Sequence, residues 1–425
     1  MKILFAMVPA TAHVYPIVPL ADALTGAGHQ VRVASPPELV DTVVKAGLTS
    51  VPIGEAGFLA AINEEIESGT ALLASLAESL RDKSPVWHTR KPLPPRPMLS
   101  AFMSLCNAGP PTDGAASAVD DLIAYARSWG PDLIIWDPMF FPGGIAAEAV
   151  GVPHARFLWS VDDMGWTREQ LRLSGVRPGS EDDLMATRMR PLLDRLGLEF
   201  SEELLVGQWS IDPMPTAMRL PVGLRYVPVR PVSYTGSAAL PDWLRQAPER
   251  PRVALSAGVS MRKVFAGAGR FPLAGLVEAL SDLDVEVVAT LNDAQIAEVG
   301  TLPDNVRCIE YVPLDLLLPT CSAIVHHGGG RTFAAAVAHQ VPQLVCAEDG
   351  PHVTDIGRFV AERGAGLVVD NDPFDVDTVR KQLVGILDDP SFKDGVRGLH
   401  RDTLAEPSPN DIVATLEQLA ASYRA

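Results

Sequence analysis

Two residues far apart in the chain have the types needed to move a proton. His13 lies in a loop expected after the apolar stretch at 2–7, and Asp137 closes the apolar stretch DLIIWD. Both stretches are predicted to be parallel strands, whose carboxyl ends meet at one edge of a sheet. A neutral imidazole there can take a proton from a hydroxyl, while a carboxylate on its other nitrogen fixes the tautomer. The pair predicts general-base chemistry. The alternatives are a surface histidine and a capping or loop acid, because Pro138 follows directly.

A second candidate site lies at 321–350, where the pattern is strand, glycine loop, helix, strand. Three glycines at 328–330 end the first strand, and an alanine-rich stretch with high helix propensity follows them. The first N–H groups of such a helix and its positive dipole end bind phosphate well. His326 and Arg331 flank the loop, and Thr332 adds a hydroxyl. A bare triple glycine is usually only a turn, but this setting predicts a diphosphate site.

These residues need parallel sheets to position them, and the chain has the required alternation of strands and helices. The expected strands are 2–7, 30–34, 48–52, 132–136, 154–159, 252–255, 285–289, 323–326, 343–346 and 366–369. Residues 55–115 depart from this alternation, and 227–250 is rich in proline. The sequence therefore predicts a first domain at 1–226, a linker at 227–250, a second domain at 251–406, and a final helix at 407–425 that docks back.

Composition restricts the class of partner. A length of 425 residues favours two domains, and a formal charge of −17 argues against nucleic acid or an anionic membrane as partner. The four cysteines lie far apart, so neither a zinc site nor a disulfide framework is indicated. The apolar start is short and interrupted by Pro9, which favours a first strand over a signal peptide. No apolar run has transmembrane length, and we expect a cytoplasmic protein without a bound metal.

The motifs occur in an order that resembles a known family. HHGGGRT at 326–332 with the following VPQLV, the stretch PATAHVYPIVPLADAL at 9–24, YTGSAALPDWL at 234–244 and the stretch 304–329 are similar to family 1 glycosyltransferases of the GT-B fold. The likeness is greatest to bacterial enzymes that attach sugars to polyketide and other antibiotic aglycones. It implies two Rossmann-like, doubly wound α/β domains facing across a cleft. It also implies inverting, metal-independent transfer from a dTDP-sugar co-substrate to a small apolar aglycone, with no cofactor and with a homodimer among the assemblies it allows.

The resemblance also implies roles for individual residues. His13 would be the base and Asp137 its partner. The expected donor contacts are Gly258, Ser260, Val312, His326, Gly328, Gly329, Gly330, Arg331, Thr332, Asp349 and His352, and the expected acceptor contacts are Thr11, Trp87, Phe102 and Phe140. His327 is interpreted as structural. Arg331, where the family usually has a small residue, either lies over the diphosphate or points to solvent.

Two departures from the family pattern matter. Thr11-Ala12 precede His13 where the family usually has glycine, and Pro351-His352 stand near the place of an acidic–Gln pair that holds sugar hydroxyls. Loss of that pair favours a deoxygenated donor, with an amino sugar facing Glu348 or Asp349 as one form of it.

Other functions stay open from sequence. One is C-transfer to an aromatic polyketide. Another is a non-catalytic homologue that binds sugar nucleotide, against which the intact His13 and Asp137 count. A third is a sugar-nucleotide epimerase, against which Trp87 and Phe102 weigh mildly. UDP as the nucleotide and a need for an auxiliary activator protein are also left open.

Overall fold

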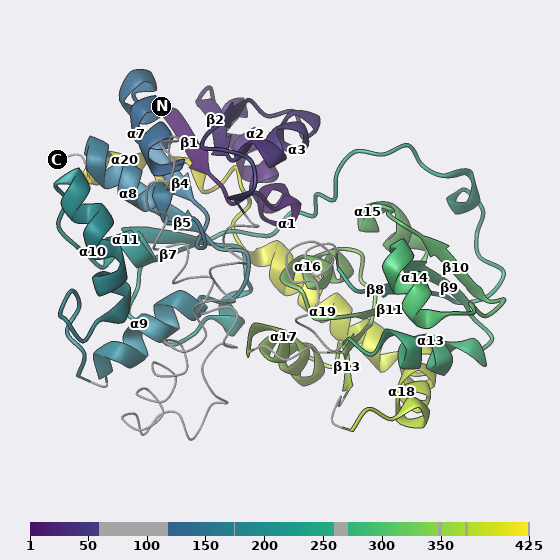
Figure 1. The fold of residues 1–425 in the computed structure, drawn as a ribbon. Coiled ribbons are helices and arrows are strands. Elements are labelled where there is room, and N and C mark those ends of the chain that lie inside the picture. The colour runs from purple at the N-terminus through teal and green to yellow at the C-terminus, as the bar shows by residue number, and fades with distance from the viewer. Residues whose placement is uncertain (59–117, 174, 259–270, 347–350, 370–372, 424–425) are drawn as a thin grey trace. The chain divides into compact units, whose positions relative to one another are not determined.

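The chain forms two compact α/β units (Figure 1). The computed structural model describes residues 1–58, 118–173, 175–258, 271–346, 351–369 and 373–423. Unit 1 comprises Met1–Val229 together with Pro407–Ala425, and unit 2 comprises Arg230–Glu406. Among the helices that the structure describes, none has the length and apolarity to cross a membrane.

Unit 1 is built on a parallel sheet with the strand order β3-β2-β1-β4-β5-β6-β7. The strands are β1 (Lys2–Ala6), β2 (Gln30–Ser35), β3 (Ser50–Pro52), β4 (Leu133–Trp136), β5 (His154–Phe157), β6 (Trp209–Asp212) and β7 (Tyr226–Pro228). The direction of winding reverses between β1 and β4. Ligands bind in open α/β sheets at such a reversal, outside the carboxyl ends of the strands.

Helices cover both faces of this sheet (Figure 1). They are α1 (Thr11–Val14), α2 (Val18–Gly26), α3 (Val40–Lys45), α7 (Ala118–Trp129), α8 (Pro142–Val150), α9 (Asp163–Leu173), α10 (Leu184–Leu196), α11 (Glu203–Val206) and α20 (Val413–Ser422), with short 3-10 turns at Tyr15–Ile17, Pro37–Leu39 and Thr216–Met218. Successive residues of β1 enter opposite layers: Leu4 packs in one core with α7 and α8, and Phe5 in the other with α2 and α3. Burial on both faces explains why these parallel strands are almost continuously apolar.

Helix α20 packs in the same core layer as α2, although it follows unit 2 in the sequence. Its apolar face buries Leu416 and Leu419, and Ile412 just before it is also buried. Tyr423 packs against Trp209, with ring centroids 5.2 Å apart and the rings tilted by 34°. The last helix therefore completes one face of the first sheet.

Unit 2 has a parallel sheet with the order β10-β9-β8-β11-β12-β13. Its strands are β8 (Arg252–Ser256), β9 (Glu286–Thr290), β10 (Val306–Ile309), β11 (Ala323–His326), β12 (Gln343–Cys346) and β13 (Gly366–Val369). The helices are α13 (Leu273–Ser281), α14 (Asp293–Val299), α15 (Leu314–Leu317), α16 (Gly330–Ala338), α17 (Pro351–Glu362), α18 (Val376–Asp388) and α19 (Ser391–Ala405), with 3-10 turns at Asp242–Leu244 and Leu318–Thr320. The winding reverses between β8 and β11, as it does between β1 and β4.

The structure differs from the sequence-based expectation in three places. His13 lies in the short helix α1, where a loop was expected. Strands β6, β7 and β10 were not predicted, and β7 occupies residues assigned to the linker. Ser233 and Thr235, also within the expected linker, belong to unit 2, where both bond to Asp315; Asp315 accepts from the hydroxyl of Thr235 at 2.6 Å.

Candidate functional site

The site in unit 1 lies where its sheet changes winding direction. His13 follows β1, and Asp137 is the residue after β4, the neighbouring strand. His13 Nδ1 and Asp137 Oδ2 are 2.7 Å apart. The carboxylate is fully buried, whereas the histidine side chain keeps 12% of its surface exposed. The pairing of these two residues agrees with the prediction from their strand-end positions.

The geometry leaves one ring nitrogen of His13 available. A carboxylate only accepts hydrogen bonds, so Nδ1 carries the proton that it donates to Asp137, and Nε2 keeps its lone pair. The other oxygen of Asp137 accepts the Met139 N–H at 2.8 Å, which holds the carboxylate plane. The pair therefore has the arrangement of a base and its orienting acid.

The structure describes two of the four residues expected to contact an acceptor, Thr11 and Phe140. Thr11 is the first residue of α1 and is partly exposed. Phe140 is fully buried and packs against Phe58 with ring centroids 5.6 Å apart. The acceptor contact expected for Phe140 stays a prediction. Trp87 and Phe102 lie outside the described residues.

One neighbour of His13 was not found from the sequence. Trp159, two residues beyond β5, packs on the imidazole with ring centroids 4.7 Å apart and an interplanar angle of 48°. An aromatic residue at a strand end usually belongs to the core, so the residue type alone did not point to a role for Trp159. Its position at the end of β5, the strand next to β4, could have predicted that it lies near His13.

The candidate donor site in unit 2 lies at the other reversal of winding. Gly258 follows β8, and the glycine loop follows the neighbouring strand β11. Gly328 has φ +88°, a conformation that L side chains rarely adopt, and Gly329 is the N-cap of α16. The first-turn N–H groups of an α-helix have no partner within the helix. The loop therefore has the geometry expected of a phosphate cradle.

His326 shapes this loop from beneath. Its ring is fully buried, Nδ1 accepts the Gly328 N–H at 3.1 Å, and Nε2 donates to Gln343 Oε1 at 3.0 Å. Burial, assisted by the nearby His327, lowers the pKa of His326 to about 3, so the ring is neutral near pH 7. A direct contact to a diphosphate, as expected from the sequence, would require one of these two bonds to be exchanged. In this structure His326 instead positions the backbone that a phosphate would meet.

His327 is held tightly between two glycines. A Cβ built on Gly258 would lie 2.3 Å from its Cε1, and one built on Gly329 would lie 2.5 Å from its Nε2. Burial lowers the pKa of His327 to about 4. Neither histidine therefore contributes positive charge near neutral pH. The backbone N–H groups and the dipole of α16 favour an anion at this loop.

The structure places four of the other residues expected to contact the donor. Arg331 donates from Nη2 to the carbonyl of Tyr234 at 2.9 Å, which ties the start of α16 to the segment that enters unit 2. Thr332 is buried in the first turn of α16, and the Val312 side chain is buried in a core cluster. His352 lies in α17. Ser260 and Asp349 are outside the described residues, as is Glu348.

One cluster in unit 1 has residue types that could hold a metal ion. Ligand atoms of Glu148, His154 and Glu203 lie within 4.8 Å of one another. The indole N–H of Trp136 donates to His154 Nδ1 at 3.0 Å, so the proton of the neutral ring is on Nε2, which faces Glu148 at 3.3 Å. A protonated nitrogen is not a metal ligand, and we assign no ion to this cluster.

Solved structures share this fold over nearly the whole chain. The glycosyltransferase VinC, solved with dTDP, is 36% identical, with 99% of this chain and 100% of the other covered and a TM-score of 0.76. The fold is that of the GT-B glycosyltransferases, with one doubly wound parallel-sheet unit for each half of the chain.

Sequence relatives identify the family within that class. Models described as the N-terminal and C-terminal domains of erythromycin biosynthesis protein CIII-like proteins match residues 22–258 and 274–419. The aclacinomycin-T 2-deoxy-L-fucose transferase of Streptomyces galilaeus is 41% identical, with 100% of this chain and 97% of the relative covered. The 10-deoxymethynolide desosaminyltransferase of Streptomyces venezuelae is 40% identical, with 100% and 98% covered. The chain belongs to the EryCIII-like family and is an antibiotic glycosyltransferase.

Proposed function

We propose that this protein transfers a deoxysugar from a dTDP-sugar to a hydroxyl of a small apolar polyketide aglycone, with inversion and without a metal ion. The observation that carries the proposal is the 2.7 Å pair of His13 and Asp137 at the carboxyl edge of the first sheet. Relatives named as deoxysugar transferases and a similar structure that holds dTDP support the donor class.

His13 and Asp137, called the dyad from here on, supply the base for the transfer step. The acceptor oxygen bonds to the anomeric carbon as its proton passes to His13 Nε2, and the bond from that carbon to the diphosphate oxygen breaks. Asp137 stabilises the imidazolium that forms, because it already accepts from Nδ1. The nucleotide leaves as dTDP, with its charge stabilised by the loop N–H groups and the N-terminus of α16, which do the work that a metal does elsewhere.

The test is single-turnover transfer at saturating donor, with mass spectrometry of the product. The donors in this test are dTDP-2-deoxysugars, with UDP-glucose as the competing donor, and the acceptors are anthracycline and macrolide aglycones. His13→Ala should slow transfer by ~10²–10⁴-fold, the usual contribution of general-base catalysis. Its affinity for dTDP by calorimetry should stay unchanged, since the candidate donor loop belongs to unit 2.

Two controls sharpen this test. Asp137→Asn should reduce the rate less than His13→Ala if it only orients the ring. A larger loss would make Asp137 the base and favour C-transfer. His400→Ala, on α19 in unit 2, is the matched histidine control and should transfer at the parent rate. Parent rates for both dyad variants would refute the proposal.

A further inference from the structure

The loop between β5 and α9 connects the dyad to a buried polar network in unit 1. Residues 158–162 form this loop, and its Trp159 packs on His13 at 4.7 Å between ring centroids. Three adjacent strands, β1, β4 and β5, thus each place one residue at the same point: His13, Asp137 and Trp159. Asp137 fixes one nitrogen of the imidazole, and Trp159 lies against the ring itself.

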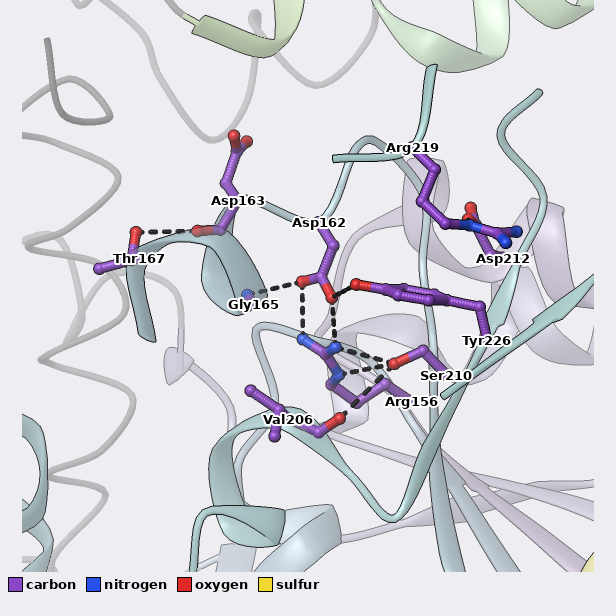
Figure 2. A network of polar contacts seen from close by, with 10 residues as sticks. All are labelled: Arg156, Asp162, Asp163, Gly165, Thr167, Val206, Ser210, Asp212, Arg219 and Tyr226. Carbon is purple, nitrogen blue, oxygen red and sulfur yellow. Dashed lines mark hydrogen bonds and ion pairs between the residues drawn. The ribbon is translucent and has the colours of Figure 1, made fainter. Parts of the chain in front are cut away.

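The far end of this loop is held by charge and hydrogen bonds (Figure 2). Asp162 accepts from both terminal nitrogens of Arg156, at 2.8 and 2.5 Å, and from the hydroxyl of Tyr226 at 2.7 Å. It also accepts the Gly165 N–H at 2.8 Å, which caps the start of α9. Arg156 donates in turn to Ser210 Oγ at 2.8 Å. The network therefore joins β5, β6, β7 and α9.

Burial makes this anchor rigid. Arg156 is fully buried and Asp162 is 6% exposed, so each charge depends on the other for stabilisation. The loop is also bonded at its start, where the Leu158 N–H donates to the Ile211 carbonyl at 2.9 Å. Trp159 lies between these two fixed points, which leaves its ring little freedom to move away from His13.

We propose that Trp159 is a positioning residue for His13, held in place by the Arg156–Asp162–Tyr226 network. The inference rests on the proposed function. A single hydrogen bond to Asp137 leaves the imidazole free to swing about that bond, and the indole ring blocks this motion on one side. As His13 accepts the proton, the ring becomes a cation beside an aromatic system, an arrangement that is favourable within about 6 Å. Trp159 thus favours both the reactive orientation and the charged product of the proton transfer.

The first test replaces the indole. Trp159→Leu should lower kcat by ~10–100-fold, because misplacing a reacting group by about 1 Å can cost 10²-fold. The KM for the aglycone and the affinity for dTDP should stay within about twofold. Trp159→Phe keeps an aromatic ring against the imidazole and should recover most of the rate. Trp129→Leu, at the opposite end of β1 where Lys2 bonds to its carbonyl, is the matched control and should retain the parent kcat.

NMR of the histidine side chains distinguishes a local change at His13 from a general loss of folding in Trp159→Leu. The ring-current shift of the indole displaces the carbon-bound proton resonances of His13, so Trp159→Leu should move those resonances in the free enzyme. The resonances of His29, His154 and His400 should keep their positions. This measurement needs no substrate and does not depend on the reaction.

The second test acts on the anchor. Tyr226→Phe removes one hydrogen bond to Asp162 but keeps the ring, and should lower kcat by a few fold in the same direction. In the Trp159→Leu background it should cause no further loss, because the network would then have no indole to hold.

Failures of the two proposals give different results. If His13→Ala is slow but Trp159→Leu keeps the parent kcat, the positioning inference is wrong and the base survives. A rise in the aglycone KM at constant kcat would make Trp159 an acceptor contact instead. If His13→Ala and Asp137→Asn both transfer at the parent rate, the proposed function fails regardless of Trp159.

Discussion

Asp162 and Asp212 are two buried carboxylates of the same network, and their surroundings shift their pKa values in opposite directions (Figure 2). For Asp162, burial opposes ionisation, but the charge and hydrogen bonds of Arg156 outweigh it and lower the pKa. For Asp212, burial dominates and raises the pKa to about 6, since the Met214 N–H and Arg219 offset it only in part. The difference follows from geometry: Arg156 makes a bidentate pair, whereas Arg219 offers one nitrogen at 3.1 Å.

Asp212 therefore makes the stability of unit 1 depend on pH in an unusual direction. Its folded pKa of about 6 lies above the ordinary value of 3.8, so between these pH values the folded state binds more protons than the unfolded state. This contribution is fully present below pH 4 and is lost as pH rises through 6. Asp212→Asn abolishes it. The free energy of unfolding of the variant minus that of the parent should increase by up to about 3 kcal/mol from pH 4 to pH 7.

Urea unfolding at several pH values, followed by tryptophan fluorescence, measures this difference. Loss of the Arg219 pair offsets the variant curve by a constant amount and does not affect its slope. Curves that stay parallel to those of the parent across this window would show that Asp212 has no raised pKa.

At the scale of residues, the sequence predicted a contact between two side chains where both follow adjacent parallel strands. His13 and Asp137 could be paired because adjacent parallel strands end at one edge. The role of His326 could not be read in the same way, since the direction of its ring depends on Gln343, which lies on the neighbouring strand β12. Phe140 was expected in the acceptor pocket, and its burial depends on packing that no short motif encodes.

Among the elements, helix α8 makes a close contact with the central strands of unit 1. A Cβ on Gly143 would lie 2.3 Å from Trp136 Cβ and 3.1 Å from Ala6 Cβ, so the helix rests directly on β1 and β4. These two strands carry the dyad. Glycine is required here for the approach of the helix and not for its own backbone conformation.

Gly143→Ala should therefore lower the stability of unit 1 by ~1–3 kcal/mol, the usual cost of overpacking a core. Gly26→Ala is the matched control, because a Cβ there meets nothing within 4 Å at the end of α2. It should be neutral or slightly stabilising, since alanine is the better helix former. Thermal unfolding of both variants compares them, and equal transition temperatures would refute the close contact.

At this scale the sequence predicted the strands next to the candidate sites and also the edge strands β3 and β13, but missed β6, β7 and β10. β10 is four residues long, lies at a sheet edge and has a single buried residue, Val306. β7 is three residues long and ends in Pro228, which an edge strand tolerates. The strands that carry the candidate sites, β1, β4, β8 and β11, are central in their sheets, and all four were predicted.

For the molecule as a whole, the main feature is that the chain returns to unit 1 after it has formed unit 2. The stability of unit 1 therefore depends on its last helix, α20. Leu416 on α20 is fully buried beneath the first sheet, although unit 2 separates it in sequence from the strands it covers. Leu416→Ala should lower the stability of unit 1 by ~2–5 kcal/mol through lost burial and the cavity left behind.

The control for this variant is Leu404→Ala, on α19 of unit 2, where the side chain is 51% exposed. It should change the transition little. Tryptophan fluorescence reports mainly on unit 1, which holds Trp129, Trp136, Trp159, Trp166 and Trp209 among its described residues. A Leu416→Ala protein with the parent transition would mean that α20 contributes no stability to the first sheet.

The placement of α20 also sets an order of events during synthesis. Unit 2 is one uninterrupted segment, whereas unit 1 needs residues from both sides of it. On the ribosome, the second half of the chain can finish folding first, while the sheet begun earliest waits with an uncovered apolar face for the last helix to emerge. The same layout makes residues 230–406 one exchangeable segment: exchange with a relative at Val229–Arg230 and Glu406–Pro407 would replace the whole of unit 2 and leave unit 1 with its native closing helix.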